Sequence, residues 1–128
     1  MLMRSLCFVI ALLFASSNAL AENWVKIGNN STGSTFHFDR DTLKSQGTSF
    51  RVWIMIDHSK DKTFTERKSK DLLLFDCENE TVTMLASYTF RADGLMIRGT
   101  TLEESKQKQE PVIPGSIGAT VFDAVCKT

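Results

Sequence analysis

Residues 49–57 read SFRVWIMID and form the clearest β-strand pattern in the chain. The even-numbered positions of this stretch are all apolar: Phe50, Val52, Ile54 and Ile56. Apolar residues at a period of two are typical of a strand that turns one face to a core. Trp53 and Met55 make the other face partly apolar as well, so we expect this strand near the centre of a sheet.

Strand-like runs separated by turn residues continue on both sides of this stretch. Including it, six runs are expected as strands: residues 24–28, 35–39, 49–57, 72–77, 81–90 and 95–99. The polar sequence NNSTGS at residues 29–34 predicts a hairpin between the first two runs. Antiparallel hairpins dominate this pattern and leave no room for crossover helices. We therefore expect one antiparallel sheet.

The last predicted hairpin carries two specific expectations. Every even-numbered residue of 81–90 is apolar, from Val82 to Phe90. This alternation predicts one continuous apolar face along the strand. The Asp93-Gly94 pair that follows predicts a primed hairpin turn, because these residues tolerate a positive φ.

One helix is expected, at the C-terminal end of the chain. Residues 40–47 predict one helical turn or a loop, and the polar, proline-ended residues 100–114 predict an extended connector. Ser116 follows this connector and is placed to cap the backbone amides of the next turn. After it, four apolar residues share one helical face: Ile117, Val121, Phe122 and Val125.

Residues 1–21 have the three parts of a secretory signal peptide. Arg4 gives a positive start, residues 6–15 are an unbroken apolar run, and residues 19–21 (Ala-Leu-Ala) form a small-x-small cleavage site. The apolar run has half the length that a membrane span needs, roughly 20 residues. We expect one mature domain, residues 22–128, with no transmembrane segment. Because its first residue is not Cys, we expect a periplasmic or secreted protein without a lipid anchor.

Removal of the signal peptide takes away Cys7 and leaves Cys77 and Cys126 in an oxidising compartment. Two cysteines there are expected to form a disulfide. A catalytic thiol or a metal site is the alternative, but neither Cys has another Cys or a His at ligand spacing. The disulfide would tie the C-terminal helix to the run at residues 72–77. The expected fold class is therefore α+β: a six-stranded antiparallel sheet with a C-terminal helix tied to it by a disulfide.

Composition and motifs exclude several functions. The chain carries 15 Lys and Arg against 15 Asp and Glu, a balance that excludes the broad basic surface of a nucleic-acid binder. His37 and His58 are the only histidines, and a metal site needs more ligands than these. Ser116 lacks the strand and Gly-x-Ser-x-Gly context of a nucleophile. We therefore expect no catalytic residue, no metal and no cofactor, and a protein that is not an enzyme.

Seven short motifs stand in order along the chain: Trp24–Gly28 (WVKIG), Phe38-Asp39, Gly47, Val52-Trp53, Phe75-Asp76-Cys77, Pro114-Gly115-Ser116 and Val125-Cys126. This ordered set, with both cysteines, resembles the surface-adhesin protein E-like family of Gram-negative bacteria. The resemblance implies a six-stranded sheet with a disulfide-tied helix, and binding to host matrix and serum proteins. The chain departs from the family pattern at His37 and Gln109, where aromatic residues are usual, and lacks the lipid-anchoring cysteine of some members.

The segment before the fourth run carries five cationic residues: Lys60, Lys62, Arg67, Lys68 and Lys70. With Asp61 and Glu66, the local charge balance is +3. One interpretation is a patch for an acidic protein surface, a sulfated glycan or lipid phosphate. The other is a solvated loop and edge strand whose lysines prevent sheet-to-sheet aggregation. We favour the second interpretation.

Three functions stay open at this point. The leading one is an exported, non-enzymatic binding module with a protein or acidic glycan partner. The alternatives are a periplasmic inhibitor of a secreted enzyme, which would insert the loop at residues 58–66, and a structural or assembly factor of the envelope. Trp53 and Met55 are expected to pack under the helix or in a homodimer rather than form an open recognition surface.

Overall fold

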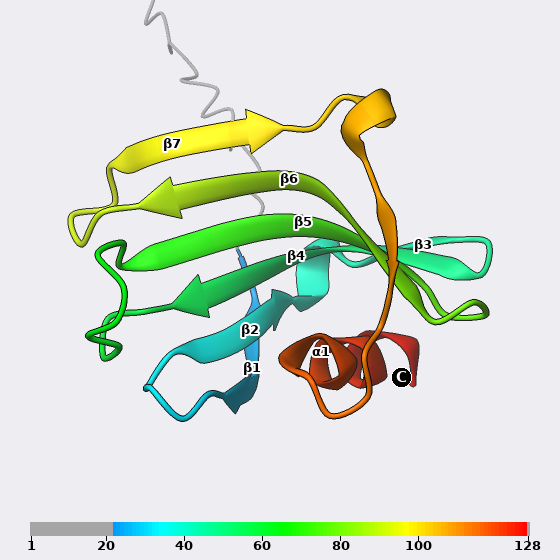
Figure 1. Ribbon diagram of the computed structural model, residues 1–128, viewed down its shortest axis with the longest axis horizontal. Coiled ribbons are helices and arrows are strands. Elements are labelled where there is room, and N and C mark those ends of the chain that lie inside the picture. The colour runs from blue at the N-terminus through cyan, green and yellow to red at the C-terminus, as the bar shows by residue number, and fades with distance from the viewer. Residues whose placement is uncertain (1–21, 128) are drawn as a thin grey trace, which may run out of the picture.

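The strand predicted at residues 49–57 forms with those bounds, as β4 (Ser49–Asp57), and lies inside one antiparallel sheet (Figure 1). The computed structural model describes residues 22–127, and the predicted signal peptide lies outside them. The other strands are β1 (Trp24–Asn29), β2 (Thr35–Asp39), β3 (Lys44–Gln46), β5 (Lys68–Asp76), β6 (Thr81–Phe90), β7 (Met96–Thr101) and β8 (Gln109–Pro111). Of the eight strands, six follow one another across the sheet in the order β1-β2-β4-β5-β6-β7, while β3 pairs with β4 and β8 pairs with β6.

The predicted α+β fold is confirmed, with six long strands and the C-terminal helix α1 (Ile117–Cys126). The short strands β3 and β8 add to the predicted sheet, each next to a 3-10 turn, η1 (Arg40–Thr42) or η2 (Glu104–Lys106). Both strands have three residues, all exposed. Their sequences, KSQ and QEP, lack the apolar alternation by which a strand is recognised, so the sequence did not predict them.

α1 packs across one face of the sheet, which we call the helix side (Figure 1). Its buried side chains are Val121, Phe122 and Val125, as predicted. They join Val52 and Phe75 of the sheet, which have no exposed surface, and Phe122 meets Phe75 edge-on with ring centroids 6.2 Å apart. Fully burying a side chain of this size stabilises the fold by about 1.5–3 kcal/mol. This packing holds a helix that would be marginal alone.

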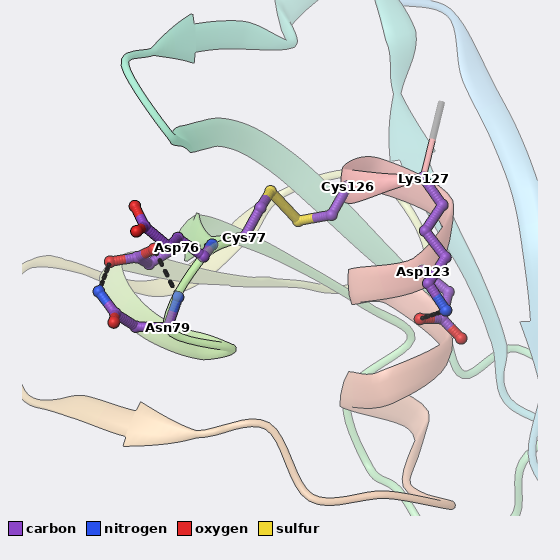
Figure 2. The surroundings of a disulfide bond; sticks show 7 residues. Asp76, Cys77, Asn79, Asp123, Cys126 and Lys127 are labelled. Carbon is purple, nitrogen blue, oxygen red and sulfur yellow. Dashed lines mark hydrogen bonds and ion pairs between the residues drawn. A yellow bond between two sulfur atoms is a disulfide. The ribbon is translucent and has the colours of Figure 1, made fainter.

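A disulfide between Cys77 and Cys126 ties the last turn of α1 to the end of β5 (Figure 2). The two Cα atoms lie 5.6 Å apart, within the range usual for disulfides, about 4.4–6.8 Å. Cys77 begins the tight turn between β5 and β6. There Asp76 accepts the backbone N–H of Asn79 at 3.0 Å, and the hydrogen bonds from Asn79 lower the pKa of Asp76. The helix is thus joined to a turn that has its own hydrogen bonds.

β5 begins at Lys68, four residues before the predicted run at Leu72. It lies between β4 and β6, so the interpretation of Lys68 and Lys70 as part of a solvated loop and edge strand is wrong. Both lysines are half-buried. Lysine stems cover apolar neighbours while the ammonium groups stay at the surface. A polar stretch of sequence can therefore form part of a central strand.

β6 contains a bulge that changes which side chains share a face. Two consecutive residues of β5 pair with residues 84 and 86 of β6, so Leu85 has no partner residue in β5. The inserted residue reverses the alternation. Met84 consequently lies on the helix side, while Tyr88 lies on the opposite face. The prediction of one continuous apolar face over residues 81–90 is wrong for this reason.

The turn between β6 and β7 forms at the predicted place with a different geometry. Arg91 N–H donates to the carbonyl of Leu95 at 2.9 Å and closes the loop. Gly94 has a positive φ of 85°, whereas Asp93 is not among the residues with positive φ. A turn followed by one left-handed glycine is a common three-residue hairpin loop, so the predicted primed turn is wrong.

Removing the disulfide tests how much the helix packing depends on it. The double variant Cys77→Ser/Cys126→Ser opens a cross-link with a sequence separation of 49 residues. The chain-entropy model gives a loss of about 4 kcal/mol for such a loop, and each kcal/mol lowers the melting temperature of a small domain by roughly 4–8 °C. We expect circular dichroism to record a fall of this size. The parent protein in reductant should match the variant; an unchanged melting temperature in both would mean that packing alone holds α1.

Candidate functional site

The face of the sheet that points away from α1, which we call the open face, carries a cluster of aromatic rings. Four of them line a shallow depression of about 280 Å³, which we call the aromatic groove: Trp24 from β1, Trp53 from β4, and Tyr88 and Phe90 from β6. All four rings are half-buried. Trp53 and Tyr88 lie 6.0 Å apart between centroids, tilted by 46°. Aromatic pairs in tilted arrangements add to the stabilisation that burial gives.

Trp53 and Met55 therefore do not pack under the helix, so that half of the prediction is wrong, while packing in a homodimer stays a prediction. They occupy the odd-numbered positions of β4, and α1 covers the even-numbered ones. Met55 is 7% exposed and pairs with Lys70 across the β4–β5 ladder. Trp53 keeps part of its ring at the surface. Of these two residues, Trp53 is thus the one that stays accessible on the open face.

Lys70 lines the aromatic groove and makes three contacts there. Its Nζ is 2.9 Å from Glu22 Oε1 and 5.5 Å from the ring centroids of both Trp24 and Phe90. Trp24 Nε1–H donates to the second oxygen of Glu22 at 2.8 Å. The hydrogen bond from Lys70, together with that from Trp24, lowers the pKa of Glu22. The groove therefore holds one carboxylate between an ammonium group and an indole N–H.

A second depression of about 330 Å³, the basic hollow, continues from the aromatic groove and shares Lys70 and Phe90 with it. The other cationic side chains that line it are Arg67, Lys68 and Arg91. Asp57 is the acidic residue in its lining. Four cations around one carboxylate make the hollow favourable for further negative charge.

The five cationic residues named from the sequence thus separate into two groups. Arg67, Lys68 and Lys70 line the basic hollow on the open face. Lys60 and Lys62 are exposed in the loop between β4 and β5, outside the lining of both depressions. Arg91, which the sequence analysis missed, joins the first group because the β6–β7 turn lies next to the start of β5. No local sequence signal connects residues 67 and 91.

A buried polar cluster, also missed from the sequence, fastens the loop that carries Lys60 and Lys62. Ser34 Oγ lies 2.8 Å from His58 Nδ1 and donates to Asp61 Oδ2 at 2.5 Å. Thr32 and Thr63 hydroxyls also donate to Asp61, at 2.6 Å and 2.5 Å. Hydrogen bonds, that from Ser34 first, hold the pKa of Asp61 far below its usual range.

The residue types of this cluster match a catalytic triad, but the geometry does not. In a triad the carboxylate orients the histidine and the histidine takes the serine proton. Here the serine hydroxyl donates to the carboxylate. All three side chains of Ser34, His58 and Asp61 are at most 4% exposed, so no substrate reaches them. The cluster joins the β1–β2 turn to the loop after β4.

The other candidate chemistry in the sequence has structural explanations. The hydroxyl of Ser116 accepts the N–H of Ala119 at 3.1 Å, which confirms the helix cap. His37 pairs with Met55 across the sheet, away from buried His58. Among residues 22–127, no three His, Cys, Asp or Glu side chains are grouped as metal ligands would be. In the same range, no helix has the length and apolar character to cross a membrane.

The fold and this site define a class of protein: a small disulfide-tied antiparallel β domain with a helix on one face and an open aromatic, basic face. A family model described as surface-adhesin protein E matches residues 24–127. The chain belongs to that family, as the resemblance implied. Membership supports an adhesin-like binding role and favours it over an enzymatic one.

Solved structures agree with this assignment at the level of the fold. The crystal form II structure of Haemophilus influenzae protein E has a TM-score of 0.59 at 8% identity, over 81% of this chain and 87% of that chain. Protein E from non-typeable Haemophilus influenzae has a TM-score of 0.55 at 9% identity, over 88% and 81%. At such low identity the likeness shows the shared fold. No curated protein sequence matches the chain significantly.

Changing Asp61 tests the role of the buried cluster. Because hydrogen bonds lower the pKa of Asp61 in the folded state, this group stabilises the fold above its unfolded pKa of about 3.9. That contribution is lost as the pH falls through the folded value. We expect Asp61→Asn to lower the melting temperature at pH 7 and to flatten its decline on acidification. Asp123→Asn, which opens only an ion pair between exposed side chains, Asp123 and Lys127 at 3.0 Å, is the control and should have the smaller effect at every pH. Identical profiles for all three proteins would contradict this role.

Proposed function

We propose that the chain is an exported, non-enzymatic binding module that recognises acidic protein surfaces through the aromatic groove and the basic hollow. The observation that carries this proposal is the ion pair between Lys70 and Glu22 inside the groove. A carboxylate already binds there, between an ammonium group and the Trp24 indole. A carboxylate from a partner protein would find the same donors.

The ring content of the groove favours a protein partner over a sulfated glycan. Tryptophan and tyrosine are enriched among the residues that dominate protein interfaces. Four half-buried rings beside Lys70 offer apolar contact for the side chains that flank an acidic residue. A glycan dense in sulfate would gain mainly from the cations of the basic hollow. Binding of a protein partner should therefore depend on the aromatic rings, whereas binding of a sulfated glycan should depend mainly on the cations.

Export is part of the proposal. The predicted signal peptide and the Cys77–Cys126 disulfide both fit an oxidising compartment outside the cytoplasm. Glu22 would be the first residue after cleavage, which puts the groove carboxylate close to the mature N-terminus. We propose a periplasmic or secreted and surface location. Oligomeric state does not enter the binding proposal, which needs only one copy of the open face.

Two matched lysine pairs test the proposal. The first variant, Lys68→Gln/Lys70→Gln, removes two charges from the open face; the control, Lys60→Gln/Lys62→Gln, removes the same two charges from the loop. We expect the first variant to lose capture of partners from host matrix and serum, and the control to retain it. Because exposed charges are screened over about 8 Å at physiological salt, capture by the parent should also weaken as salt rises.

The outcomes separate the proposal from its alternatives. Loss of capture in the control and not in the groove variant would contradict the proposal and favour the loop, as an inhibitor of a secreted enzyme requires. Capture of envelope components alone would point to an assembly factor. A third variant, Trp53→Ala, distinguishes the partner class: it should weaken binding of an acidic protein and leave binding of heparin unchanged.

A further inference from the structure

α1 covers only part of the helix side of the sheet. A groove of about 420 Å³ remains between α1, the sheet and the connector that follows β7, and we call it the connector groove. Its floor and walls include apolar side chains from β4, β5, β6 and α1: Ile56, Leu73, Val82, Met84, Ile117 and Val121. Ligand pockets in proteins occupy about 300–1,000 Å³. The connector groove therefore has the size of a small-ligand site.

Hydrogen bonds at both ends hold the connector away from the floor of the groove. At one end Leu102 N–H donates to the carbonyl of Leu85 at 2.8 Å, where β6 bulges. At the other end β8 pairs with β6, and Gln109 Nε2–H donates to Thr81 Oγ1 at 2.7 Å. Met84 lines the connector groove and is nevertheless 41% exposed. The groove is thus a built feature of the fold.

The connector supplies a charged rim. Lys106, Lys108 and Glu110 all line the groove, with one residue between successive charges. Two ammonium groups against one carboxylate give this rim a positive balance. Asp71, on the floor, is bonded by the hydroxyl of Ser87 at 2.7 Å, and burial raises its pKa. The cationic side chains that line the groove, Lys106 and Lys108, therefore both belong to the connector.

We propose that the connector groove binds a single-chain fatty acid, with the acyl chain along the apolar floor and the carboxylate at Lys106 and Lys108. An apolar trough with cations at one edge complements a molecule with one apolar tail and one anionic end. The volume, near the lower limit for ligand pockets, favours one chain over the two chains of a phospholipid. This site lies on the face opposite the aromatic groove, so it does not depend on the proposed function.

Palmitate binding to the disulfide-bonded protein tests this proposal, with calorimetry to measure affinity and stoichiometry. We expect one palmitate per chain. Met84→Glu places a carboxylate in the groove, and the cost of burying an unpaired charge should lower affinity by more than about tenfold. Met96→Glu is the matched control, since Met96 is 52% exposed on β7 and lies outside the groove lining. Both variants change an exposed methionine, so both should fold, which circular dichroism checks.

A second comparison tests the position of the carboxylate. Lys106→Gln/Lys108→Gln should weaken palmitate several-fold and leave hexadecanol, which has the chain without the charge, unchanged. Vesicles of dipalmitoyl phosphatidylglycerol should not bind, because the groove takes one chain. The proposal is overturned if palmitate does not bind, if Met84→Glu binds it as well as Met96→Glu, if the lysine variant weakens both ligands equally, or if the vesicles bind as tightly as palmitate.

Discussion

The disulfide between Cys77 and Cys126 fixes the one helix on one side of the sheet, and the division of the molecule into two faces follows from it. A helix of ten residues is marginal alone, and both the disulfide and the packing against Val52 and Phe75 hold it on the sheet. With α1 bound to the helix side, the aromatic rings of the opposite face stay at the surface. The connector then has to cross the part of the helix side that α1 leaves uncovered, which creates the connector groove.

On the open face, packing and electrostatics meet at Lys70. A cation over an aromatic ring contributes about 0.5–1 kcal/mol at an exposed site, and an exposed ion pair contributes about 0–1 kcal/mol. Lys70 has two rings at 5.5 Å and the Glu22 carboxylate at 2.9 Å. The rings hold the ammonium group in position independently of its acidic partner. Because the ion pair itself is weak, Glu22 can be exchanged for another carboxylate at little cost in stability, as a reversible binding site requires.

The sequence alone predicts the parts of this structure that depend on local patterns. The alternation of β4, the cap at Ser116, the apolar face of α1 and the cysteine pair were all readable, and all are confirmed. Features that depend on contacts between distant residues were not. The bulge at Leu85 leaves no mark on the alternation of residues 81–90, so the faces of β6 were assigned wrongly. The sequence at the start of β5 resembles a loop, because the sequence does not distinguish a half-buried lysine from one that is fully solvated.

The candidate site follows the same rule. Its lysines were named from the sequence, but their grouping with Trp24 and Arg91 arises only when β1 and the β6–β7 turn reach the ends of β5. The open face is where we propose that partners bind. The chain has two tryptophans, Trp24 and Trp53, and both line the aromatic groove. Fluorine NMR of protein labelled with 5-fluorotryptophan therefore observes this groove directly: both resonances should shift when a captured partner is added, and resonances that stay unchanged at saturation would contradict the account.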